Sequence, residues 1–168
     1  MTSAYANKVL KKLKDDKNYY LNKEEEGQVY VAAIDEEPVI PDYDYEEISA
    51  RIAEIDDKIV KIKHTINVVN ATNIISVGDS EMTVDTILIR MAQLNNRKSV
   101  LDIMRKRQKK TREKYGVLNV RKTAPEYQYL NYDLKLVSSE YERIDSEIAA
   151  MQMALDKFNQ TFEFDVEY

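Results

Sequence analysis

The densest set of chemically active side chains is a basic run, "RKRQKKTREK", from Arg105 to Lys114. Clustered guanidinium and ammonium groups can neutralise the phosphates of RNA, DNA or anionic lipid. The candidate anion-binding residues are Arg105, Lys106, Arg107, Lys109, Lys110 and Arg112. The run contains no aromatic residue that could stack on a base, and cations at a helix end also complement the helix dipole. We therefore expect intramolecular ion pairs here, with nucleic-acid binding by a helical arm as the alternative.

Acidic residues gather in a second segment, where Asp35, Glu36 and Glu37 precede Asp42 and Asp44. Carboxylates are preferred ligands of Ca²⁺ and Mg²⁺, so a metal-dependent hydrolase is the enzymatic hypothesis that this cluster allows. Their spacing is not that of an EF-hand, and a solvated acidic linker is the preferred interpretation. We expect no metal site and no cofactor.

Other signs of catalysis are missing from the sequence. The single histidine, His64, falls between the apolar positions Ile62 and Ile66, and there is no cysteine to complete a zinc site with it. No Gly-rich phosphate loop, HExxH or GxSxG motif is present. We expect His64 beside the core or on the surface, and a protein that is not an enzyme.

The segment around residues 73–83 combines amide and hydroxyl side chains with a loop that is unusually apolar. Asn67, Asn70 and Asn73 follow at helical spacing, so their amides could cap a helix or bind a ligand. The apolar loop could contact a protein partner. Capping is the preferred interpretation. The candidate partner-binding residues of this tip are Asn67, Asn70, Thr72, Ile75, Val77, Thr83 and Arg90.

The composition limits the class of protein. Of 168 residues, 43% are hydrophobic and 33% are charged, and three Gly and three Pro predict few, long elements. The absence of cysteine and of an apolar signal segment at the N-terminus favours the cytoplasm. The longest uncharged run, 65–78, is too short to span a membrane. The net charge of −5 argues against general nucleic-acid affinity.

Apolar residues at heptad spacing predict four helices, at 4–25, 45–72, 84–114 and 131–160. The second is the clearest, because isoleucine or valine recurs in alternating steps of four and three at positions 48, 52, 55, 59, 62, 66 and 69. Lys17 and Lys98 interrupt the seams of the first and third helices. Thr83 is expected to cap the third helix, with Gly116 as its stop. The matched lengths predict an all-α antiparallel coiled-coil helical bundle of three to four long helices, with minor short β-strands.

The rest of the single domain 1–168 is divided into a strand and linker at 27–42, a tip loop at 73–83, a connector at 115–130 and a C-terminal strand at 161–168. The C-terminal segment alternates apolar with acidic residues, which predicts one buried face and pairing with 28–34 or 117–122. Twelve tyrosines, many near predicted helix ends, would either cap the bundle or form a binding surface. The acidic starts of the second and fourth helices would lie near the basic run and pair with it.

Apolar residues on several sides of the third helix favour an oligomer. Six aliphatic side chains lie off its main heptad line, namely Val84, Leu88, Ile89, Val100, Ile103 and Met104. Burial of each contributes roughly 1.5–3 kcal/mol, and a two-helix hairpin leaves part of each face wet. We therefore expect a homo-oligomer joined through heptad seams, acting as a scaffold or protein-interaction module without a membrane or nucleic-acid partner.

Several short motifs resemble small bacterial proteins of the septicolysin-like family. The region Ile66–Leu94 carries Asn67, Asn70 and Thr72, then Gly78-Asp79, and then Thr83 and Arg90. "KKLK", "EEEG" and "EEP" within 11–38 and "IAAMQMALDKFNQTFEFDVE" at 148–167 are similar to the two ends of that family. The resemblance implies a helical, coiled-coil-like fold and supplies no catalytic residues. The family label suggests a cytolysin, whereas this chain has no membrane-inserting stretch. The long basic end of the third helix departs from the shorter family pattern.

Overall fold

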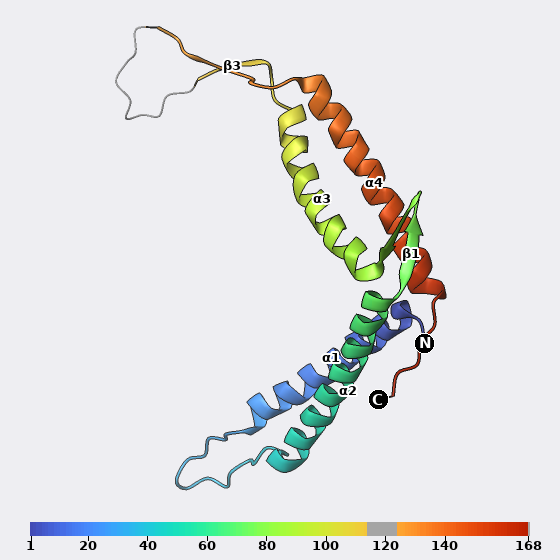
Figure 1. Ribbon diagram of the computed structural model, residues 1–168. Helices are drawn as coiled ribbons and strands as arrows, with labels where there is room; N and C mark the ends of the chain where they lie inside the picture. Colours follow the sequence, from blue (N-terminus) through green and yellow to red (C-terminus); the bar gives the residue numbers. More distant parts are fainter. Residues whose placement is uncertain (114–123, 168) are drawn as a thin grey trace. The chain divides into compact units, whose positions relative to one another are not determined.

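The computed structural model describes residues 1–113 and 124–167, which are mostly helical (Figure 1). Over these residues the helices are α1 (Ser3–Gly27), α2 (Tyr45–Thr72), α3 (Val84–Arg105) and α4 (Leu134–Thr161). The strands are β1 (Ile74–Val77), β2 (Ser80–Thr83), β3 (Lys110–Arg112) and β4 (Tyr127–Tyr129). They form two small antiparallel sheets, β1–β2 and β3–β4. A mainly α-helical fold with minor strands is therefore confirmed, whereas a single coiled-coil bundle stays a prediction.

The chain divides into two compact units, where the sequence predicts one domain. The first unit holds residues 1–75, 83–85 and those from Leu155 onward, and the second holds 76–82 and 86–154. The boundary thus falls inside α4. Within the described parts of the chain, no helix has the length and apolar character needed to cross a membrane.

The first unit contains the antiparallel pair α1 and α2. Ala6 and Leu10 of α1 pack with Ile62 of α2 in a shared core. The buried α2 residues Ile48, Ile55, Ile62 and Val69 recur every seven positions, so the heptad seam faces the core as expected. Lys17, which interrupts the α1 seam, donates to the carboxylate of Asp56 at 2.6 Å. Its ammonium group therefore stays at the edge of the core and ties the register of the two helices.

The helix ends of the first unit follow local rules. The Asp44 side chain accepts a hydrogen bond from the Glu47 amide at 3.0 Å and so begins α2. At the end of α1, a Cβ on Gly27 would lie 2.5 Å from the Tyr43 Cβ. Glycine is needed here because the segment that enters α2 passes against the α1 backbone.

The second unit contains α3 and the first part of α4, which run antiparallel. Leu101 packs with Val137 and Ile144, and the Tyr132 hydroxyl donates to the Met104 carbonyl at 2.8 Å. Lys98, the residue that interrupts the α3 seam, pairs with Asp145. The α3 and α4 backbones approach each other less closely than those of α1 and α2.

The C-terminal segment packs on the first unit. Phe164 and Val166 lie against the Ala6–Ile62 core, while the alternating acidic residues are exposed. The segment pairs with the start of the chain, because the Phe164 amide donates to the Met1 carbonyl at 2.9 Å and Glu163 forms a bridge with Thr2. The C-terminal strand expected at 161–168 is not formed over the described residues, because Thr161 belongs to α4 and Glu163 makes only an isolated bridge. The alternation of half-buried and exposed residues agrees with the expected single buried face, but pairing with 28–34 was wrong, since 28–34 forms no strand. The other expected partner, 117–122, lies outside the described residues.

The segment 73–83 forms a hairpin where a loop was expected. β1 and β2 are joined at Gly78-Asp79, and Gly78 has a φ of 57°, which glycine adopts without strain. β1 alternates exposed Ile74 and Ser76 with half-buried Ile75 and Val77. Thr83 directly precedes α3, as expected for a capping position.

The third helix ends at Arg105, well before the expected end at Lys114. Lys110–Arg112 leave the helix because their backbone groups find partners in β4. The expected helix end at Lys114, its stop at Gly116 and most of the connector 115–130 fall on residues outside the described ranges, except that 127–129 forms β4.

We expect Leu101→Ala to lower the free energy of unfolding by about 2–5 kcal/mol, because the side chain is 1% exposed and leaves a cavity against Val137 and Ile144. The matched control is Leu136→Ala in the same unit, where the leucine is 70% exposed and the change should stay within about 0.5 kcal/mol. Urea unfolding followed by circular dichroism measures both. Equal effects of the two substitutions would contradict this core.

A second prediction concerns pH. Glu147 of α4 accepts hydrogen bonds from Arg90 Nε at 2.7 Å and Arg143 Nη1 at 2.9 Å. The Arg90 hydrogen bond is the main cause that lowers the pKa of Glu147 below its ordinary 4.5. A lowered folded-state pKa stabilises the fold above the unfolded value, and this stabilisation disappears as pH falls through the folded value.

Glu147→Gln should therefore destabilise the protein at pH 7 by about 0.5–1 kcal/mol, as for other surface ion pairs. The difference between variant and wild type should be smaller at pH 3, because the carboxylate is progressively protonated as pH falls through its lowered pKa. Urea unfolding of the two proteins at both pH values measures it. The same difference at pH 3 and pH 7 would show that the carboxylate charge does not act as described.

Candidate functional site

The first part of the basic run is held by intramolecular contacts. Arg105 and Lys106 both pair with Asp102, one turn earlier in α3. The Arg105 guanidinium also lies 3.9 Å from the centre of the Tyr141 ring. The hydrogen bonds from Lys106 and Arg105 to Asp102 are the main cause that lowers the pKa of Asp102. Intramolecular ion pairs were expected for this run, and these two cations have them.

The remaining cations of the run differ from that expectation. Within residues 1–113 and 124–167, no carboxylate lies at ion-pair distance from Arg107, Lys109, Lys110 or Arg112. The expected acidic partners act elsewhere: Asp44 caps α2, and Asp133 accepts a hydrogen bond from the Lys135 amide. These four cations lie beyond the end of α3, and the ion pairs expected for them with the start of α4 are not found among the described residues of the second unit.

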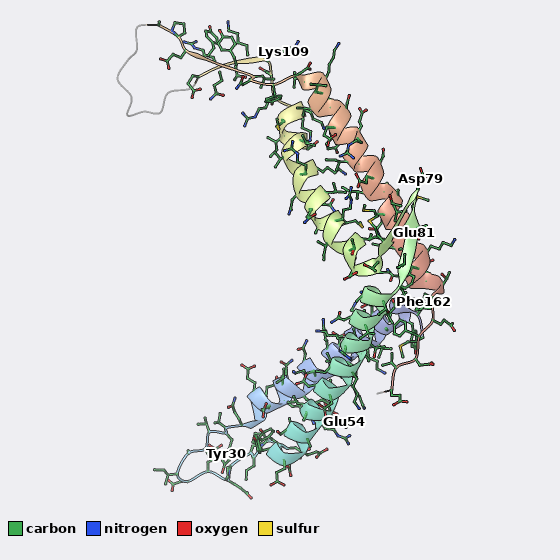
Figure 2. All side chains as sticks on the ribbon, in the orientation of Figure 1. Tyr30, Glu54, Asp79, Glu81, Lys109 and Phe162 are labelled. Atoms are coloured by element: carbon green, nitrogen blue, oxygen red, sulfur yellow. The ribbon has the colours of Figure 1, made fainter. Side chains whose placement is uncertain are left out.

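The end of the run forms a two-stranded ribbon with β4. Lys110 pairs with Tyr129, Thr111 with Gln128 and Arg112 with Tyr127, and all six residues are exposed. The Lys110 ammonium lies 4.2 Å from the Tyr127 ring centre and 5.4 Å from that of Tyr129. Figure 2 shows the side chains that surround this ribbon, with Lys109 labelled at its start. The aromatic residues that the basic run itself lacks are therefore supplied by a distant strand.

Sequence reasoning missed Tyr127 and Tyr129 as partners of the cations. A signal was present, because "YQY" alternates tyrosine with a polar residue as a strand with one aromatic face does. Only the pairing of β3 with β4 connects this signal with Lys110 and Arg112.

Several of the candidate tip residues have local partners within their own part of the fold. Arg90 pairs with Glu147 in the second unit, and Thr72 donates to the Val68 carbonyl at 2.8 Å within α2. Thr83 donates to the Asp85 carboxylate at the start of α3. Asn73 donates to the Val69 carbonyl at 2.8 Å, which is the capping role preferred from the sequence. The exposed aliphatic side chain of the hairpin is Ile74, whereas Ile75 and Val77 are half-buried.

Asn67 and Asn70 complete the set of tip residues. Asn70 is half-buried near the end of α2. Asn67 is exposed in a shallow hollow of about 390 Å³ between α1 and α2, which Lys11, Lys14 and Lys63 also line. These lysines border a hollow open to solvent, and no side chain buried within it points to a ligand.

The acidic segment and His64 form no constellation in the described structure. Asp35, Glu36 and Glu37 are exposed in a segment without helix or strand. His64 is exposed on α2. In the described ranges, no three histidine or acidic residues lie close enough together to hold a metal ion.

An apolar surface lies on α3, on the side opposite its packed seam. At about 100° per residue, Ile89, Val100 and Ile103 project roughly opposite to Ile87 and Leu101. Ile89 is 59% exposed, Val100 48% and Ile103 61%, whereas Ile87 and Leu101 are buried. We call the surface formed by Ile89, Ala92, Asn96, Val100 and Ile103 the outer face of α3. A helix that is apolar on two opposite sides has more to bury than its single partner α4 covers.

Comparisons of the chain with protein-family models, with curated proteins and with solved structures found no match. The resemblance to septicolysin-like proteins therefore stays a prediction.

Proposed function

We propose that this protein is a homo-oligomeric helical scaffold whose copies meet through the outer face of α3. The observation that carries the proposal is that α3 is apolar on two opposite sides. One side packs on α4 through Leu101, and the other exposes Ile89, Val100 and Ile103. A second copy of the same helix is an occupant of matching chemistry, because an isologous contact needs one self-complementary surface.

The spacing of the outer face supports a helix as its partner. Ile89, Asn96 and Ile103 are seven residues apart, and Ala92 and Val100 lie between them. Positions 89, 96 and 103 repeat every seven residues, as one position of a coiled-coil seam does, and Asn96 is the central polar residue of the three. An asparagine at such a position favours one register, because its amide finds a partner only when the two copies are aligned. Asn96 lies near the middle of α3, so a two-fold contact would bring the two Asn96 residues together.

The exposed surface of the chain also supports association. The chain exposes 13090 Å². Two separate globular bodies, each of half its 19.6 kDa mass, would together expose roughly 10,300 Å². Copies packed on one another would reduce this exposed surface.

The energy available from the outer face sets the expected affinity. Completing the burial of three half-exposed aliphatic side chains on each of two copies contributes roughly 5–10 kcal/mol, from about 1.5–3 kcal/mol per fully buried side chain. Association costs about 4–15 kcal/mol. The outer face alone would therefore give a weak dimer, and a stable oligomer must also bury neighbouring apolar residues such as Leu88, which is 46% exposed.

Light scattering coupled to size-exclusion chromatography tests the proposal. At tens of micromolar, the wild-type protein should elute with a mass that is a multiple of 19.6 kDa. Ile89→Glu with Ile103→Glu should give the mass of one chain, because two carboxylates would be buried at the contact. The helical circular dichroism of this variant should match that of the wild type, since both positions are exposed in the single chain.

The matched control is Val60→Glu, which introduces the same charge at an aliphatic position of α2 that is 65% exposed. This variant should keep the oligomeric mass. A wild-type mass of one chain at these concentrations would overturn the proposal. Dissociation by Val60→Glu but not by the α3 variant would place the contact on another surface.

A further inference from the structure

The β3–β4 ribbon has two chemically different faces. Residues directly opposite in an antiparallel pair, and residues two apart in one strand, project to the same side. The register therefore places Lys110, Arg112, Tyr127 and Tyr129 on one face, which we call the ribbon face. Thr111 and Gln128 project to the other side.

The same alternation separates the charges beyond the strands. The Glu113 amide donates to the Glu126 carbonyl at 2.9 Å, and the Leu130 amide donates to the Lys109 carbonyl at 3.2 Å. These bonds continue the register by one pair at each end. Lys109, Glu113 and Glu126 consequently belong to the side of Thr111 and Gln128, and the ribbon face carries two cations and two aromatic rings without a carboxylate.

The ribbon face is open to solvent and its rings are ordered by a cation. Tyr129 is 66% exposed and Tyr127 41%. These two rings therefore do not serve as part of a core, as buried tyrosine rings usually do. The Lys110 ammonium group lies over both rings, so it forms one cluster with the two tyrosines. Neither Lys110 nor Arg112 has a carboxylate partner in the described part of the chain. The charge of this face is thus available to an external anion.

We propose that the ribbon face binds single-stranded nucleic acid, with bases stacked on Tyr127 and Tyr129 and phosphates bound by Lys110 and Arg112. Nonspecific single-strand binding combines these two features, because every base has a π-face and every nucleotide a phosphate. A duplex hides its base faces by stacking, so it offers the tyrosines no comparable contact. A protein segment could bind the two cations through its acidic side chains alone. It would not need the two tyrosine rings.

The charge balance sets the expected strength. The whole chain has a net charge of −5, so attraction is restricted to the ribbon and binding should be weak and sensitive to salt. Contact of two cations with two phosphates predicts a slope of about −1.4 for the logarithm of the binding constant against the logarithm of salt concentration.

Fluorescence anisotropy of labelled 20-nucleotide strands of deoxythymidine and of uridine, titrated with the full chain from 20 to 200 mM salt, tests the inference. The chain has no tryptophan, so its tyrosine emission gives a second readout that stacking on bases should quench. We expect Tyr127→Ala with Tyr129→Ala, and Lys110→Gln with Arg112→Gln, to weaken binding at least tenfold. The two strands distinguish DNA from RNA, and binding of either supports the proposal.

Three comparisons separate this role from a structural one. Tyr127→Phe with Tyr129→Phe should bind within about threefold of the wild type, because the rings that stack are retained. Lys109→Gln, the matched charge change on the opposite face, should do the same. A duplex of the same length should bind at least tenfold more weakly than the single strand.

No binding by the wild type at 20 mM salt and 100 µM protein would overturn the proposal. So would equal weakening by Lys109→Gln, or a duplex that binds as tightly as the single strand. Binding to vesicles containing phosphatidylserine without binding to either strand would assign the face to an anionic membrane and would also overturn it. None of these outcomes depends on the oligomeric state.

Discussion

The packing of helices in pairs is the constraint on which the rest of this structure depends. A helix in a two-helix pair buries one stripe and leaves the opposite side exposed. In both pairs, a lysine on the seam reaches an aspartate on the partner helix, Lys17 to Asp56 and Lys98 to Asp145. A polar group on a seam costs stability but fixes the register. The cores are therefore narrow and aligned, and any additional apolar residue must be buried by other means.

That constraint gives the two sides of α3 different roles. The side of Leu101 completes the second unit, while the side of Ile89 and Ile103 is exposed in the single chain. Isolated aliphatic residues on a protein surface need no explanation, but three on one side of one helix do. The proposed assembly follows from this surplus of apolar surface.

A feature of the fold could be predicted from the sequence where the interactions that cause it are local. The expected bounds of the second helix, 45–72, agree with Tyr45–Thr72, because an aspartate cap and a regular isoleucine seam lie in the helix itself. The end of α3 at Arg105 was missed, since it depends on pairing with β4 more than twenty residues later. The strand expected at 28–34 has β-rich residues but no partner, and exposed Val31 and Ile34 lie in an irregular segment.

The candidate sites show the same division. Asn73 bonds to backbone within one turn, and the sequence indicated its capping role. The ribbon face could not be predicted, because register alone joins Lys110 to Tyr127 and Tyr129. Nucleic-acid binding was the alternative hypothesis from the sequence, disfavoured in part because the basic run lacks interleaved aromatic residues, and the fold supplies such residues from another strand. The spacing of residues along the chain thus contained separate signals for the cations of β3 and the tyrosines of β4. It gave no sign that they share one surface.

The central claim is that copies of this chain meet at the outer face of α3. The chain has no cysteine, so Asn96→Cys introduces a single thiol at the middle of that face. Oxidative cross-linking at micromolar concentration, analysed by denaturing electrophoresis, should convert this variant to a covalent dimer. The control Asn95→Cys, one residue around the helix and also exposed, should cross-link far more slowly. Equal, slow cross-linking of both variants would show that the two Asn96 positions do not meet and would contradict the account.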